Sequence, residues 1–102
     1  MKKQSIFVFL ELKIITGELE FSSKTVHDVT LLLDEKKLKK QQSGLITNGI
    51  NEFAEDYASQ FYDCKSEKEG DYFEFQGGAI AVKVTNVIEI TEHTYKVMKN
   101  FI

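Results

Sequence analysis

The 102-residue chain has no proline, no tryptophan and only one cysteine, Cys64. A single cysteine cannot form a disulfide within the chain, so nothing in the sequence points to secretion. No apolar run approaches the roughly 18 to 20 residues that a membrane-spanning helix needs. The N-terminal stretch resembles a signal peptide in its basic start, but Glu11 and Lys13 interrupt it and no small-residue cleavage site follows. We therefore expect a cytoplasmic protein without a membrane segment, and a first strand at the N-terminus.

Arginine is also absent, because all 13 basic residues are lysine. Arginine reads guanine edges and phosphates through two parallel hydrogen bonds, so its absence argues against nucleic-acid binding. The net charge of −3 is unevenly distributed. Residues 1–50 hold eight lysines against six acids, whereas residues 51–102 hold five lysines against ten acids. The second half is therefore distinctly acidic.

The hydrophobic pattern of the first third predicts two long strands. A chain of this length can close one core without disulfides or metal, so we expect a single domain over residues 1–102. Apolar side chains alternate over residues 5–16, which indicates a strand, and a turn follows at 16–18. A similar alternation predicts a second, bent strand over residues 19–33. A helix over residues 25–41 is the competing interpretation, but its β-branched start is poor helix material.

The clearest signal in the sequence predicts an amphipathic helix over about residues 44–62. Its apolar residues recur at steps of three and four and comprise Ile46, Ile50, Phe53, Tyr57 and Phe61. The pair Asn48-Gly49 is also typical of a hairpin turn. A glycine inside a helix costs about 1 kcal/mol, whereas each buried apolar side chain contributes roughly 1.5–3 kcal/mol, so the helix is favoured. In the alternative the helix begins as late as Asn48. In place of the helix over 25–41, Asp34 is expected to cap a separate short helical turn before the main helix.

The remaining third predicts a second hairpin and a final helix. Residues 63–71 are polar and are expected to form a loop. Strands are expected at 72–75 and from residue 80 to 90, joined through Gly77-Gly78, because hairpin turns need positive φ angles. Thr91 is expected to cap a helix over 92–101 with a buried stripe of Val97, Met98, Phe101 and Ile102.

These elements predict an α+β two-layer sandwich in the order β-β-α-β-β-α. We expect an antiparallel four-stranded sheet, because two hairpins are joined through a helix. Both helices, at about 44–62 and 92–101, are expected on one face of that sheet.

No group of residues has the pattern of a catalytic or cofactor site. Cys64 follows Asp63 in an acidic segment, and such neighbours oppose thiolate formation. A cysteine nucleophile would also need a base, and only His27 and His93 could supply one. His27 shares strand parity with core residues and is expected to be partly buried. We therefore predict no catalytic residue and no cofactor, with a small enzyme or ligand binder around Cys64 and His27 as an alternative.

Two charged segments suggest ligands but fit them poorly. Acids from Asp63 to Glu74 fall at several positions of a twelve-residue calcium loop, but a lysine stands at its third position and its glycine is displaced. No metal site is predicted. The lysines Lys36, Lys37, Lys39 and Lys40 could touch phosphates, which makes a nucleic-acid-binding accessory protein a second alternative.

Two predicted surfaces could instead bind a protein. Glu52, Glu55 and Asp56 lie together on the exposed side of the helix and could guide a basic partner. Phe7, Phe9 and Tyr72 are expected on the sheet face away from the helices, and exposed aromatics in a row are typical of an interface, including a homodimer. We expect a small non-enzymatic adaptor or inhibitor, of the anti-defence type that a phage or another mobile element would direct at a host protein.

Overall fold

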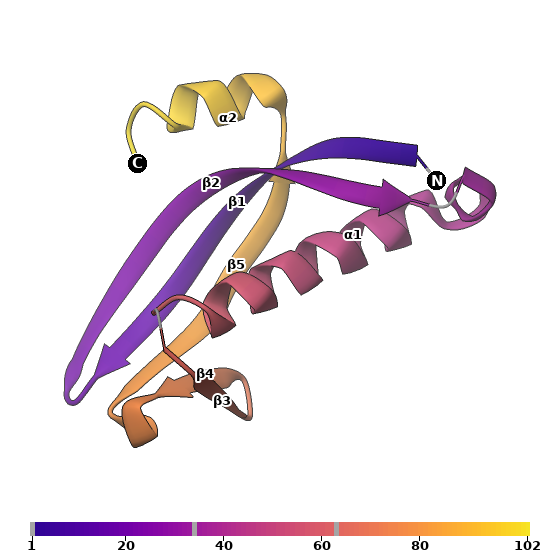
Figure 1. The fold of residues 1–102 in the computed structure, drawn as a ribbon. Helices are drawn as coiled ribbons and strands as arrows, with labels where there is room; N and C mark the ends of the chain where they lie inside the picture. Colours follow the sequence, from indigo (N-terminus) through magenta and orange to yellow (C-terminus); the bar gives the residue numbers. More distant parts are fainter. Residues whose placement is uncertain (1, 34, 63) are drawn as a thin grey trace.

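The computed structural model describes residues 2–33, 35–62 and 64–102, and the side chains of residues 3–32, 46–62 and 64–102. It is an α+β fold in which five strands form one antiparallel sheet, accompanied by two helices (Figure 1). In chain order the elements are β1 (Lys2–Thr16), β2 (Leu19–Leu33), α1 (Glu35–Ser59), β3 (Ser66–Glu69), β4 (Tyr72–Phe75), the 3-10 turn η1 (Gln76–Gly78), β5 (Ile80–Ile90) and α2 (Glu92–Met98).

The strand order across the sheet is β2-β1-β5-β4-β3, which places β2 at one edge and β3 at the other. The long hairpin of β1 and β2 pairs over its whole length, from Lys2 opposite Leu33 to Thr16 opposite Leu19. Strand β5 pairs with β1 through a bulge beside Glu11, where Thr85 Oγ1 donates hydrogen bonds of 3.1 Å to the Glu11 carbonyl and Oε1 oxygens. A bulge of this kind bends a strand and increases its twist.

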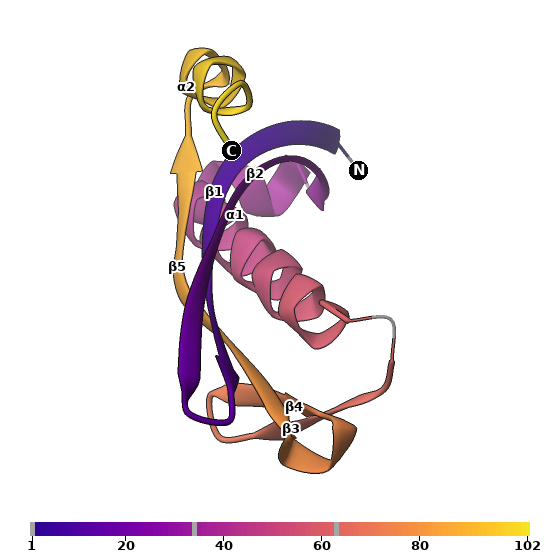
Figure 2. The same cartoon turned by 90° about the vertical axis from the view of Figure 1, so that its left-hand side faces the viewer.

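Helix α1 crosses one face of the sheet and creates the core (Figures 1 and 2). The even-numbered side chains of β1 from Ile6 to Ile14 point toward it and are buried. Ala54 and Ala58 of α1 are also buried, and their small side chains let the helix backbone approach the strands closely. Phe75 of β4 is fully buried in the same cluster. The apolar stripe predicted for residues 44–62 is therefore the face that meets the sheet.

Helix α2 lies on the opposite face of the sheet, so the expectation of both helices on one face is wrong. Its Tyr95 ring lies 4.9 Å from the ring of Phe7, and Phe7 points away from α1. Thr91 caps the helix as predicted, because its Oγ1 accepts a hydrogen bond of 3.1 Å from the Thr94 amide. The predicted buried stripe is wrong, since three of its members are exposed: Val97, Phe101 and Ile102.

Several predicted boundaries also change. The strand over 19–33 is confirmed, and the competing helix over 25–41 is wrong in its first part. Helix α1 begins at Glu35, so the predicted short turn and the main helix are one continuous element, while the proposed Asp34 cap lies outside the described residues. The segment expected to be a loop contains β3, which pairs with β4 and raises the strand count from four to five. Of the described helices, neither is long and apolar enough to cross a membrane.

The core assignment predicts unequal effects for two identical substitutions. Phe75→Ala should lower the free energy of unfolding by about 3–5 kcal/mol, because Phe75 is 0 % exposed and its removal leaves a cavity. Phe101→Ala should change it by less than about 0.5 kcal/mol, because Phe101 is 80 % exposed. Urea unfolding followed by circular dichroism measures both, and equal losses would contradict this core.

Candidate functional site

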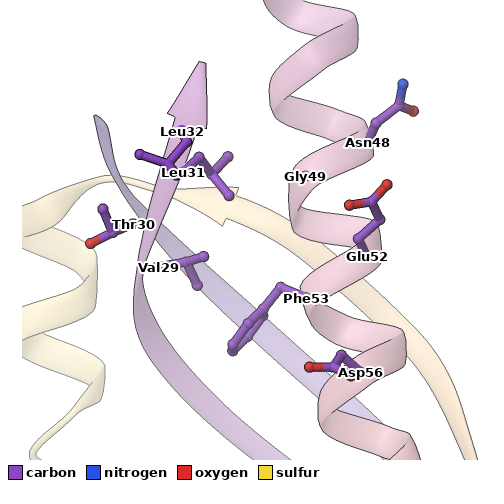
Figure 3. A pocket seen from close by; sticks show the side chains of 9 residues that line it. All are labelled: Val29, Thr30, Leu31, Leu32, Asn48, Gly49, Glu52, Phe53 and Asp56. Carbon is purple, nitrogen blue, oxygen red and sulfur yellow. The ribbon is translucent and has the colours of Figure 1, made fainter. Parts of the chain in front are cut away.

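An open groove of about 790 Å³ lies between the edge strand β2 and helix α1 (Figure 3). Four consecutive residues of β2, from Val29 to Leu32, form one wall. Val29 and Leu31 point toward α1, whereas Thr30 and Leu32 point away from it, so residues from both faces of β2 border the groove at the sheet edge (Figure 3). The other wall comes from α1 and consists of Asn48, Gly49, Glu52, Phe53 and Asp56.

Gly49 explains why the two walls approach each other at the end of the groove formed by Leu31 and Leu32 (Figure 3). A Cβ atom at this position would lie 2.8 Å from Leu31 Cδ1, which is too short for a normal contact. The helix therefore meets the Leu31 side chain through its bare backbone. The glycine predicted to be tolerated within the helix is located where β2 packs against it.

The acidic residues of α1 do not all have the same surroundings. Glu52, Glu55 and Asp56 are exposed, as predicted, and Glu52 and Asp56 line the groove. Glu55 is directed elsewhere and pairs with Lys68 of β3 at 3.4 Å. Asp56 Oδ1 accepts a hydrogen bond of 3.3 Å from Gln60 Nε2. The groove therefore has a carboxylate-bearing rim above an apolar floor that includes Val29 and Phe53.

The three residues of the predicted aromatic face lie on the side of the sheet away from α1, but only Phe7 and Phe9 are neighbours. Phe7 and Phe9 point away from α1 and are half-buried. Phe7 is covered in part by Tyr95 of α2, whereas Phe9 pairs with Val26 and with Ile88, which is 47 % exposed.

Tyr72 does not join this aromatic pair. It lies on β4 opposite Lys83, whose Nζ is 5.4 Å from the centre of the tyrosine ring. Lys83 and Ile88 are five positions apart on β5, which corresponds to about 16 Å along the strand. The three proposed residues therefore belong to two separate places on the outer face.

The other sequence-based candidates are not brought together. Cys64 is exposed in a hollow formed with Gln60, Tyr62 and Lys65, and this hollow includes no histidine. The segment compared with a calcium loop forms the hairpin of β3 and β4, with Asp63 outside the described residues. No cluster of three or more potential metal ligands occurs in the part of the chain that the structure describes. The side chains of Lys36, Lys37, Lys39 and Lys40 lie outside that part.

His27 is packed beneath α1, next to the groove. Its ring lies 5.2 Å from the ring of Phe53 and 4.8 Å from that of Tyr57. Its Nε2 is 2.7 Å from Thr25 Oγ1, where the direction of the hydrogen bond depends on the tautomer. Burial among these groups lowers the pKa of His27 below its usual value of 6.5, because the charged imidazolium loses hydration. The predicted partial burial of this histidine is confirmed.

The β2 wall of the groove was not predicted from the sequence. The alternation predicts that Leu31 and Leu32 belong to a strand. They line a groove only because that strand, β2, is at the edge of the sheet. The order of strands in a sheet is set by long-range pairing, which local alternation does not report. The one local signal was Leu32 itself, an apolar residue on the strand parity opposite to the core, and it is 62 % exposed.

The sequence and the fold of the chain were compared with those of known proteins. No family model matches the chain, and no match was found among curated proteins or solved structures.

The lowered pKa of His27 predicts a dependence of stability on pH. The folded protein favours neutral His27, so its full contribution is present above pH 6.5 and is lost as the pH falls through the folded-state pKa. Thermal unfolding should show a midpoint that falls between pH 7.5 and 5.5, with a smaller fall for His27→Gln. His93→Gln, which changes an exposed histidine, should behave like the parent chain. A His27→Gln variant with the full pH dependence would contradict this account.

Proposed function

We propose that the chain is a small non-enzymatic protein-binding domain that recognises a basic segment of its partner. The observation that carries this proposal is the placement of Glu52 and Asp56 along a groove with an apolar floor. Apolar area supplies binding energy, while complementary charge guides the approach and fixes the orientation of a partner. Glu55 extends the negative potential on the same helix although it is paired with Lys68.

An adaptor or an inhibitor fits this surface better than an enzyme does. The acids are exposed, and a group of exposed carboxylates attracts cations at a distance. A small acidic domain could cover a basic groove on a larger protein, such as the substrate channel of a nucleic-acid enzyme. An origin in a phage or another mobile element, with a host protein as the target, is the setting in which we place such an inhibitor.

Charge reversal on α1 tests the proposal. A variant with Glu52→Lys, Glu55→Lys and Asp56→Lys should lose capture of its partner from a bacterial lysate, as measured by affinity pulldown and mass spectrometry. The loss should be at least about tenfold, because like charges would then face each other across the interface.

A matched variant controls for the change in net charge. Glu18→Lys, Glu89→Lys and Glu92→Lys also reverse three exposed acids, which lie in the β1–β2 turn, on β5 and on α2. This variant should capture the same partner as the parent chain. Unchanged capture by the α1 variant would contradict the proposal, as would an equal loss in both variants.

The outer sheet face supports a second proposal, homodimerisation. Phe9, Val26 and the 47 % exposed Ile88 lie next to one another on neighbouring strands. Contiguous apolar side chains of this kind are typical of contact between protein chains. Two copies could bury this area against each other while leaving the groove on the opposite face open.

Light scattering tests the dimer through a single substitution. The parent chain should have twice the mass of one chain at high concentration, and Phe9→Glu should return it to a monomer because a carboxylate would be buried without a partner. Phe21→Glu is the control, since Phe21 is 52 % exposed and on the other face of the sheet. A monomeric parent chain, or a dimer that Phe9→Glu does not affect, would rule out this interface.

A further inference from the structure

Within the part of the chain that the structure describes, no strand pairs with the outer edge of β2, including its upper part at residues 29–32. Edge strands present unpaired backbone donors and acceptors, and proteins usually protect them with charged side chains, bulges or covering elements. The first half of β2 carries such charges. Lys24 forms an ion pair with Glu11 of β1 at 3.7 Å, and Glu20 forms one with Lys13 of β1 at 3.4 Å. From Val29 to Leu32 the edge carries no charged side chain and faces the groove.

We infer that the partner enters this groove as an extended basic segment that adds a sixth strand to the sheet at β2. The inference rests on the proposed function and specifies how the partner binds. Strand addition uses backbone hydrogen bonds for affinity and alternate side-chain positions for selectivity. Side chains on one face of the added strand would meet the α1 wall, and those on the other face would lie beside Leu32.

The chemistry of the walls defines the segment that would fit. On the α1 side, lysine or arginine side chains would approach Glu52 and Asp56. On the opposite side, apolar side chains would extend the exposed surface of Leu32. An alternation of basic and small apolar residues satisfies both faces at the strand period of two.

Charge argues against a second copy of this chain as the occupant. Two β2 edges that pair in antiparallel orientation are related by a two-fold axis perpendicular to the sheet. That axis would place both α1 helices on the same face, with the Glu52 and Asp56 carboxylates of one copy toward those of the other. Like charges in such an arrangement oppose association, whereas a basic segment neutralises them.

A defined peptide tests strand addition directly. The probe is a fluorescein-labelled octapeptide of alternating lysine and valine with both ends capped, and the control is the same peptide with every backbone amide N-methylated. The control retains the charge and loses its hydrogen-bond donors, as proline does in a strand. Fluorescence anisotropy at low salt should show saturable binding of the probe, weakened at least about tenfold for the control. The probe should also slow amide hydrogen exchange within residues 29–32.

Two leucines of equal exposure provide matched variants. Leu32→Lys should weaken binding of the probe at least about tenfold, because it places a positive charge on the edge of the groove. Leu19→Lys should leave binding unchanged, since Leu19 is also a 62 % exposed residue of β2 but lies outside the groove.

The outcomes separate this inference from the proposed function. If both peptides bind equally and Glu52→Lys abolishes binding of both, strand addition is overturned while acidic recognition by α1 stands. No saturable binding up to about 1 mM probe would also overturn it, and the pulldown then decides the proposed function independently. Protection of residues 29–32 that rises with protein concentration alone would overturn it in favour of a second copy.

Discussion

The packing of α1 across one face of β1 is the contact on which the rest of the structure depends. Strand β1 is flanked by β2 and β5, and its even-numbered side chains form the floor of the core. Ala54 and Ala58 allow the helix to lie close to that floor, where larger side chains would force it away. The helix passes beside β2 where Gly49 meets Leu31, and the groove lies between β2 and the turns of the helix around Glu52 and Asp56.

The contrast between the two sides of the sheet follows from this arrangement. One face is closed by a long helix and contains the fully buried residues, whereas the other receives only the short α2 near Phe7. The two edges differ as well. Strand β3 is four residues long and carries Glu67, Lys68 and Glu69, all features that discourage further pairing. Strand β2 is 15 residues long, and its last five residues, 29–33, carry no charge. We therefore place the proposed partner strand at the uncharged end of β2.

Local patterns predicted the elements better than their arrangement. Alternation identified β1 and β2, and the period of 3.6 identified the sheet-facing side of α1, because both patterns reflect burial of one face. The earlier start of α1 was missed because residues 35–42 lack a clear apolar stripe, and β3 was missed because all four of its residues are polar. The side of the sheet chosen by α2 and the edge position of β2 depend on long-range pairing. The acidic half of the candidate site could therefore be predicted, but its strand half could not.

Amide hydrogen exchange in the free chain is the most direct test of the central claim that α1 closes the sheet while leaving the β2 edge open. Amides of residues 7–16 of β1 should exchange only through global unfolding, because this part of the strand is paired with β2 on one side and with β5 on the other. Within β2, residues 29–32 should alternate between protected amides that bond to β1 and fast-exchanging amides that face the groove. Uniform protection of these β2 amides at low protein concentration would contradict the account, as would fast exchange throughout β1.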